Sequence, residues 1–163
     1  GVLGLALIGM ALLGRLLDSG RQDVGYDPDV TRGELLNDAG GQSAEPAKVW
    51  QENLVFSCVF DTDQLASLIA EAPQREGAYF VSTSTCDPLR MPEIAEAATR
   101  KGWRFLEVPI SGTSAQLTEG DAVLLVAGDP ADAQALAPVL SAVGRAQHYV
   151  GPVGNGEETS CWD

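Results

Sequence analysis

The chain has 163 residues, of which 45% are hydrophobic, and this size and composition are typical of one globular domain with a substantial core. Its formal net charge of −13 disfavours nucleic acid and anionic membrane surfaces as partners, because few cations are present to neutralise phosphates. Three cysteines without a C-x-x-C pair indicate a reducing compartment, which we expect to be the cytoplasm, and the single histidine, His148, disfavours a histidine-based metal site.

Strand and helix patterns alternate along the chain, which predicts an α/β, Rossmann-like fold: a doubly wound, mostly parallel sheet in a three-layer αβα arrangement. Strands are predicted at residues 2–5, 23–26, 42–44, 54–59, 78–81, 104–108, 122–127 and 148–150. Helices are predicted at residues 7–19, 30–37, 46–51, 62–72, 88–101 and 129–143. The acidic residues of helices 62–72 and 129–143 are expected to face solvent.

The first predicted strand enters a glycine-spaced turn, Gly4-x-Ala6-x-x-Gly9, and a helical pattern follows at once. This arrangement is typical of a dinucleotide site in which a helix N-terminus holds the pyrophosphate. Gly4 would allow the tight turn and Gly9 the close helix–strand packing, whereas Ala6 carries a Cβ where the fingerprint prefers glycine. Taken alone, the motif is equally compatible with a buried strand–helix corner. A membrane or signal segment is disfavoured because the apolar run ends at Arg15.

Asp27 ends the second predicted strand, 18 residues after Gly9. A carboxylate at this place can accept hydrogen bonds from the adenosine ribose hydroxyls and would repel a 2′-phosphate, which favours NAD over NADP. The alternative interpretation is a turn aspartate before Pro28. Asp29 lies one step too far along the chain for this role and is expected to be a helix N-cap.

Polar or irregular residues follow three further strands, at the sheet edge where ligands collect in open α/β folds. These segments are Val59-Phe60-Asp61, Ser84-Thr85 and Ser111-Gly112-Thr113. Their hydroxyl and N–H groups suit a ribose, a carboxamide or a substrate carboxylate, and turn or cap chemistry is the alternative. Cys58, inside an apolar strand, is expected to be a packed and inert thiol, and His148 a surface or packing residue.

Together these segments resemble the cofactor domain of the β-hydroxyacid dehydrogenase family, which includes 3-hydroxyisobutyrate dehydrogenase and tartronate semialdehyde reductase. The cofactor-domain pattern is also similar to that of 6-phosphogluconate dehydrogenase. The most specific match is residues 105–113, FLEVPISGT, which resemble the family's F-L-D-A-P-V-S-G-G. Residues 4–9 resemble G-L-G-x-M-G, residues 57–61 resemble C-L-P-D, residues 84–88 resemble S-T-x-x-P, and residues 151–156 resemble the segment before the interdomain helix.

The resemblance implies an oxidoreductase that transfers hydride between NAD and a small 3-hydroxy acid or semialdehyde. It implies cofactor contacts by the residues of the fingerprint and of three later segments: Gly4, Ala6, Leu7, Ile8, Gly9, Asp27, Val59, Phe60 and Thr85. It also implies a substrate carboxylate held by Ser111, Gly112 and Thr113. Residues 1–163 are then expected to be a single dinucleotide-binding domain, without the family's helical C-terminal domain, through which we expect a homodimer to form.

The sequence departs from the family at the lysine that serves as general acid/base in the pattern G-x-G-x-x-x-K. Counting from Gly154 places Ser160 at this position, and loss of a general acid lowers turnover by roughly 10²–10⁴-fold. Val59-Phe60 and Ser82 also differ from the family pattern. Two alternatives therefore stay open. One is a non-catalytic dinucleotide-binding or assembly module. The other is an imine reductase, a group that also dispenses with the lysine but whose usual NADPH preference fits the acidic end of strand two poorly.

Overall fold

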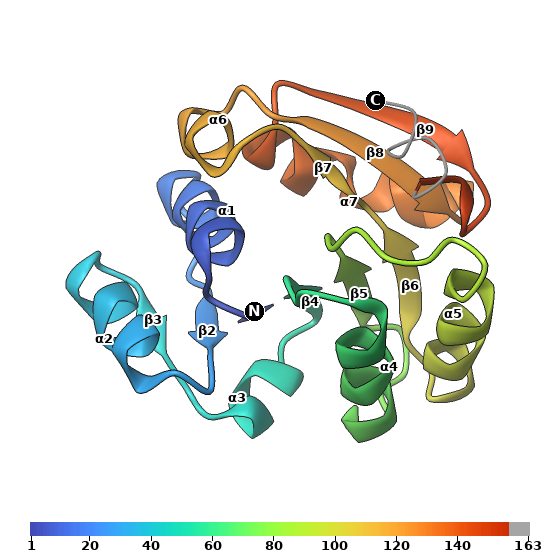
Figure 1. Ribbon diagram of the computed structural model, residues 1–163, viewed down its shortest axis with the longest axis horizontal. Helices are drawn as coiled ribbons and strands as arrows, with labels where there is room; N and C mark the ends of the chain where they lie inside the picture. Colours follow the sequence, from blue (N-terminus) through green and yellow to red (C-terminus); the bar gives the residue numbers. More distant parts are fainter. Residues whose placement is uncertain (157–163) are drawn as a thin grey trace.

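The computed structural model describes residues 1–156, which form a nine-stranded sheet between two layers of helices (Figure 1). The strands are β1 (Val2–Leu3), β2 (Val24–Tyr26), β3 (Gln42–Ser43), β4 (Leu54–Ser57), β5 (Tyr79–Ser82), β6 (Arg104–Glu107), β7 (Ile110–Ser111), β8 (Val123–Gly128) and β9 (Ala146–Gly151). Six strands run parallel in the order β3-β2-β1-β4-β5-β6. β8 is antiparallel to β6, and β9 is parallel to β8. The predicted mostly parallel sheet is confirmed.

The helices are α1 (Leu7–Asp18), α2 (Val30–Asp38), α3 (Pro46–Trp50), α4 (Thr62–Glu71), α5 (Met91–Arg100), α6 (Ser114–Glu119) and α7 (Pro130–Val143). One core cluster joins α1, α6 and α7 to one face of the sheet, and a second joins α3, α4 and α5 to the other (Figure 1). Val55 and Phe56 of β4 belong to different clusters, and both are buried, as a strand covered on both faces requires. None of the described helices is long and apolar enough to span a bilayer.

The parallel strands end at a common edge, and the first turn at this edge depends on glycine. β1 ends after Leu3 because Gly4 has a left-handed φ of +99°, which glycine adopts without strain. The N–H of Gly4 donates to the carbonyl of Tyr26 at 2.9 Å, so the turn stays tied to β2. A Cβ on Gly4 would lie only 3.0 Å from the carbonyl carbon of Cys58, and so β1 can approach the end of β4 closely.

Two short elements, β7 and α6, have no counterpart among the predicted elements. β6 and β7 both pair with β8, and Pro109, which has no N–H to donate, separates them. α6 begins with a capping box: Thr113 Oγ1 accepts from Gln116 N at 3.1 Å, and Gln116 Oε1 accepts from Thr113 N at 2.8 Å. The T-x-x-Q spacing is the sequence signal that identifies this helix start.

The expectation that the acidic residues of α7 face solvent is wrong for Asp132, which is 6% exposed. Its Oδ1 accepts from Arg104 Nη1 at 3.0 Å, and this pair ties α7 to the start of β6. α5 begins at Met91, later than predicted, because residues 88–90 form a turn in which Asp87 Oδ1 accepts from Leu89 N at 2.9 Å. The other elements agree with prediction apart from small differences at their ends.

Candidate functional site

A cleft lies at the carboxyl edge of the parallel strands, beside the N-terminus of α1. It has two lobes, of about 740 and 730 Å³, and each is within the size range of small-molecule and cofactor sites. The two lobes share five lining residues, which are Ala6, Arg32, Cys58, Val59 and Phe60. They therefore form one continuous cleft.

The predicted cofactor residues all line this cleft. Gly4 and Asp27 line the first lobe, Leu7, Ile8, Gly9 and Thr85 line the second, and Ala6, Val59 and Phe60 line both. Of the predicted substrate residues, Gly112 lines the second lobe, whereas Ser111 and Thr113 are not among the lining residues. The Thr113 side chain instead caps α6. Ser160 lies outside the described residues.

The N-terminus of α1 has no side-chain cap. Ala6 is its N-cap, with an extended φ of −70°, so a Cβ fits here without strain although the fingerprint prefers glycine. The first turn of α1 carries no acidic residue, and the side chain of Ala6 offers no acceptor to the first N–H groups of the helix. Such a helix start attracts anions, because unpaired N–H groups and the helix dipole both present positive charge.

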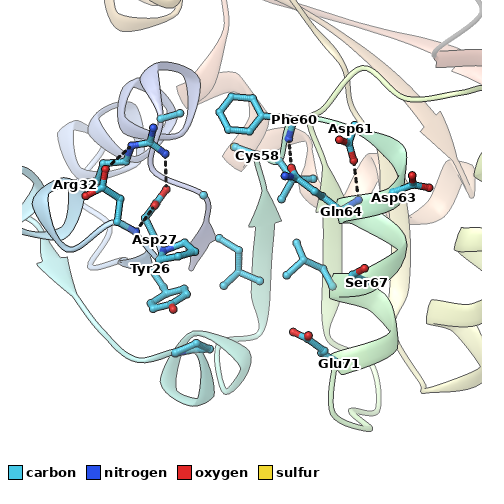
Figure 2. Close-up of a pocket in the computed structure, with 18 residues that line it drawn as sticks. Tyr26, Asp27, Arg32, Cys58, Phe60, Asp61, Asp63, Gln64, Ser67 and Glu71 are labelled. Atoms are coloured by element: carbon cyan, nitrogen blue, oxygen red, sulfur yellow. Dashed lines mark hydrogen bonds and ion pairs between the residues drawn. The ribbon is translucent and has the colours of Figure 1, made fainter.

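Asp27 faces the first lobe and also holds the fingerprint loop (Figure 2). Its Oδ2 accepts from Leu5 N at 2.8 Å and from Arg32 Nη1 at 3.1 Å, and its Oδ1 accepts from Asp29 N at 2.8 Å. Burial acts to raise the pKa of Asp27, but these three hydrogen bonds outweigh it and hold the pKa below its ordinary value of 3.8. Asp27 is therefore ionised at neutral pH. Asp29 is the N-cap of α2, as predicted, and accepts from Thr31 N at 3.0 Å.

Arg32 is a charged site residue that the sequence prediction missed. Its guanidinium pairs with Asp27, lies 3.8 Å from Asp29 Oδ2, and lines both lobes. The signal that identifies it is its position on the first turn of α2, five residues after Asp27. A guanidinium beside an acidic strand end is important for cofactor choice, because arginine binds phosphate oxygens well.

The opposite wall of the first lobe is one face of α4. Figure 2 shows Gln64, Ser67 and Glu71 along this helix, across the cleft from Asp27 and Arg32. Gln64 Oε1 accepts from the N–H of Phe60 at 2.7 Å, which fixes the loop after β4. The carboxylate of Asp61 in that loop caps α4 and accepts from Gln64 N at 2.8 Å, so its cap role is confirmed.

The floor between the lobes contains a thiol. Cys58 is half-buried, packs against one core cluster and lines the cleft, so the expectation of a packed thiol is confirmed, although it lies one residue after the end of β4 and not inside the strand. Its Sγ lies 3.1 Å from Thr83 Oγ1, and the Thr83 hydroxyl donates to Ser57 O at 2.9 Å, so Cys58 must be the donor to Thr83. Burial raises the pKa of Cys58 to about 11. The thiol is therefore protonated at neutral pH and a poor nucleophile.

Comparisons with known proteins agree with this geometry. Residues 1–151 match the family model described as the NAD binding domain of 6-phosphogluconate dehydrogenase. The cytokine-like nuclear factor N-PAC of Xenopus tropicalis is 30% identical over 162 residues, which cover 95% of this chain and 30% of that protein. Glyoxylate/succinic semialdehyde reductase 1 of Arabidopsis thaliana is 30% identical over 168 residues, which cover 96% of this chain and 56% of that protein. The chain thus spans about half or less of these relatives.

Solved structures show the same fold. A 3-hydroxyisobutyrate dehydrogenase of Mycobacterium tuberculosis with L-serine has a TM-score of 0.90 at 22% identity, over 98% of this chain and 56% of that one. An imine reductase variant from Myxococcus stipitatus in complex with NAD+ has a TM-score of 0.91 at 24% identity, over 99% and 57%. Psf3 in complex with NADP+ has a TM-score of 0.90 at 22% identity, over 99% and 60%.

The family match covers nearly all of the described residues, and it includes the fingerprint, Asp27 and the strands that form the cleft. The chain belongs to the family of NAD-binding domains represented by 6-phosphogluconate dehydrogenase, the cofactor domains of the β-hydroxyacid dehydrogenases.

Proposed function

We propose that the chain binds NAD across the two-lobed cleft, as the cofactor domain of an oxidoreductase for a small 3-hydroxy acid or semialdehyde. The observation that carries this proposal is the uncapped N-terminus of α1, which opens onto the cleft beside both lobes. A pyrophosphate there would accept hydrogen bonds from the N–H groups of Leu7 and Ile8. The bound nicotinamide supplies or accepts the hydride, and the residues of this chain hold and orient it.

The first lobe suits the adenosine half. An ionised carboxylate has about four acceptor sites, and Asp27 already uses three of them, so one remains for a ribose hydroxyl. The second lobe suits the nicotinamide half, because the exposed apolar side chains of Leu7 and Phe60 can cover a ring there. Gly112 lies in this lobe, which fits a substrate carboxylate near the Ser111-Gly112-Thr113 turn.

The charges of the first lobe favour NAD over NADP. The guanidinium of Arg32 is already paired with Asp27 and lies near Asp29, so little of its charge is available to a 2′-phosphate. Asp61 and Glu71 also line this lobe and add negative charge, whereas the carboxylate of Asp63 is paired with Arg90. Similar structures hold either NAD+ or NADP+, and so the preference rests on these charges.

A calorimetric titration of NADH and NADPH into wild type and two variants tests the proposal. Asp27→Asn keeps the size and an acceptor oxygen but removes the charge, so NADH should bind about tenfold more weakly and NADH selectivity should fall. The control is Asp63→Asn at the rim of the lobe, because the carboxylate of Asp63 points away from Asp27 and Arg32 (Figure 2) and pairs with Arg90 at 2.6 Å. Absence of NADH binding at millimolar cofactor refutes the nucleotide site, and unchanged selectivity in Asp27→Asn removes Asp27 from it.

The wider assembly is also part of the proposal. We propose that residues 1–163 are one dinucleotide-binding domain, that a helical domain outside them completes the substrate pocket and a homodimer, and that the protein is cytoplasmic. The chain covers 56% of the reductase relative, which supports a further domain. In the protein that contains both parts, Ser160→Lys should raise turnover of a hydroxy acid if residue 160 is the acid/base position. Activity that survives Ser160→Ala and is not raised by Ser160→Lys would place the acid/base elsewhere.

A further inference from the structure

Glu107 is a fully buried carboxylate at the end of β6, and it does not line the cleft. Its Oε1 accepts from the N–H of Gly154 at 3.2 Å and from the N–H of Gly156 at 2.8 Å. These donors belong to the segment that follows β9, almost fifty residues later in the chain. A buried polar group is costly unless it is hydrogen-bonded, so the two backbone N–H groups stabilise this side chain in the core.

The Gly154-x-Gly156 spacing fits this carboxylate. Gly154 has a left-handed φ of +103°, which a side chain would strain. A Cβ on Gly156 would lie 2.6 Å from Glu107 Oε1 and 3.1 Å from its Cδ, closer than side chains pack. Val153 packs against the core cluster beneath α3, α4 and α5, which holds the segment from a second side. The two glycines thus form a backbone receptor for one carboxylate oxygen.

β6 gives this receptor a rigid base. Glu107 is in register with Ser82 of β5 on one side and with Ala127 of β8 on the other, so its backbone is paired on both sides. Ser111 in β7 lies four residues after Glu107 in the chain, and the next residue, Gly112, lines the second lobe. Glu107 therefore connects the segment before residue 157 to the strand that leads into the substrate end of the cleft.

We propose that Glu107 is a positioning residue, whose carboxyl group fixes the segment 151–156 against β6 and so sets the position from which the chain continues beyond residue 156. The effect of this positioning on catalysis rests on the proposed function. The contacts of Glu107 with Gly154 and Gly156, which we call the clamp, do not rest on it, because they lie within residues 1–156.

Amide hydrogen exchange measured by NMR tests the clamp. In Glu107→Ala the protection of the Gly154 and Gly156 amides should fall at least about tenfold, because the shared acceptor of both hydrogen bonds is lost. Glu107→Gln keeps a neutral acceptor and should give intermediate protection. The matched control is Ser82→Ala, the register neighbour, whose hydroxyl has no hydrogen-bond partner within residues 1–156 and whose loss should leave both amides unchanged. Unchanged protection in Glu107→Ala overturns the proposal.

A double-mutant cycle covers the case in which Glu107→Ala unfolds too readily for exchange measurements. Gly156→Ala should lower the melting temperature clearly in wild type, because its methyl group meets Glu107 Oε1. In the Glu107→Gln background the collision remains, whereas in Glu107→Ala it is relieved, so the two alanine substitutions should be strongly non-additive. Additive losses would show that the carboxylate and Gly156 do not interact, and would overturn the proposal.

The positioning role is separated from general destabilisation by cofactor binding and turnover. In Glu107→Gln the Kd for NADH should stay within about twofold of wild type, because Glu107 is outside the cleft. The kcat of the full-length enzyme should fall roughly 10–100-fold, because the chain beyond residue 156 would be misplaced. An equal loss in NADH affinity and kcat, or an unchanged kcat, contradicts positioning. If wild type binds no NADH, the proposed function fails, and the exchange result still decides the clamp.

Discussion

Gly9 and Gly14 lie in the same helix, α1, but have different surroundings. A Cβ on Gly9 would lie 2.8 Å from the carbonyl carbon of Gly4 and closer still to its oxygen, whereas a Cβ on Gly14 would meet no atom within 4 Å. Ordinary contacts of this kind begin at 3.4 Å, so Gly9→Ala must move α1 away from the fingerprint turn by at least about 0.6 Å (3.4 minus 2.8). Gly14→Ala requires no movement.

The same substitution should therefore have opposite effects at the two positions. Overpacking in Gly9→Ala should cost about 1–3 kcal/mol or more, which lowers the melting temperature by about 2–12 °C in a domain of this size. Gly14→Ala should gain up to about 1 kcal/mol of helix propensity and raise it by about 2–4 °C. Circular dichroism during thermal unfolding measures both. A melting temperature for Gly9→Ala at or above that of wild type would refute the close approach of α1 to the turn.

Three further predictions concern single side chains. Asp27 has a folded-state pKa below 3.8, so Asp27→Asn should lower the free energy of unfolding by about 1–2 kcal/mol at pH 7. This difference in stability from wild type should shrink as the pH falls below 3.8, and a difference that stays constant with pH contradicts the prediction. Cys58 has a pKa of about 11, so peptide mass spectrometry should show much slower alkylation of Cys58 at pH 8 in the folded than in the unfolded chain, with the rate rising towards pH 11. Fast alkylation of the folded chain at pH 8 would show that Cys58 is a thiolate. Thr113→Ala removes the cap of α6 and should lower stability in urea by about 1 kcal/mol, more than Thr118→Ala inside the helix; equal losses would argue against the capping box.

The fold was predictable because its signals are local in sequence. Apolar strands, amphipathic helices and the Gly4-x-Ala6-x-x-Gly9 turn each fit within a short window, and their alternation limits the topology. β7 and α6 are too short to give a clear period, although Pro109 and the Thr113 cap mark them. Short elements of this kind are found from cap and breaker residues rather than from periodicity.

The place of the site was predictable, but its internal contacts were not. Asp27 could be placed at a strand end, since strand ends share one edge. Its hydrogen bond from Leu5 N depends on the pairing of β1 with β2, and its contact with Arg32 depends on how α2 packs beside β2. The partner of Asp132 is Arg104, and the partners of Glu107 are glycines almost fifty residues away. Such long-range pairs appear only when the sheet is assembled.

NMR of the backbone amides during titration with NADH tests whether the N-terminus of α1 holds the pyrophosphate of NAD. We expect saturable shifts that are largest at Leu7 and Ile8, with smaller shifts at Asp27 and Phe60 in the two lobes and none at Gly154. Saturable binding that leaves the amides of Leu7 and Ile8 unchanged, or no shift at millimolar NADH, would contradict this expectation.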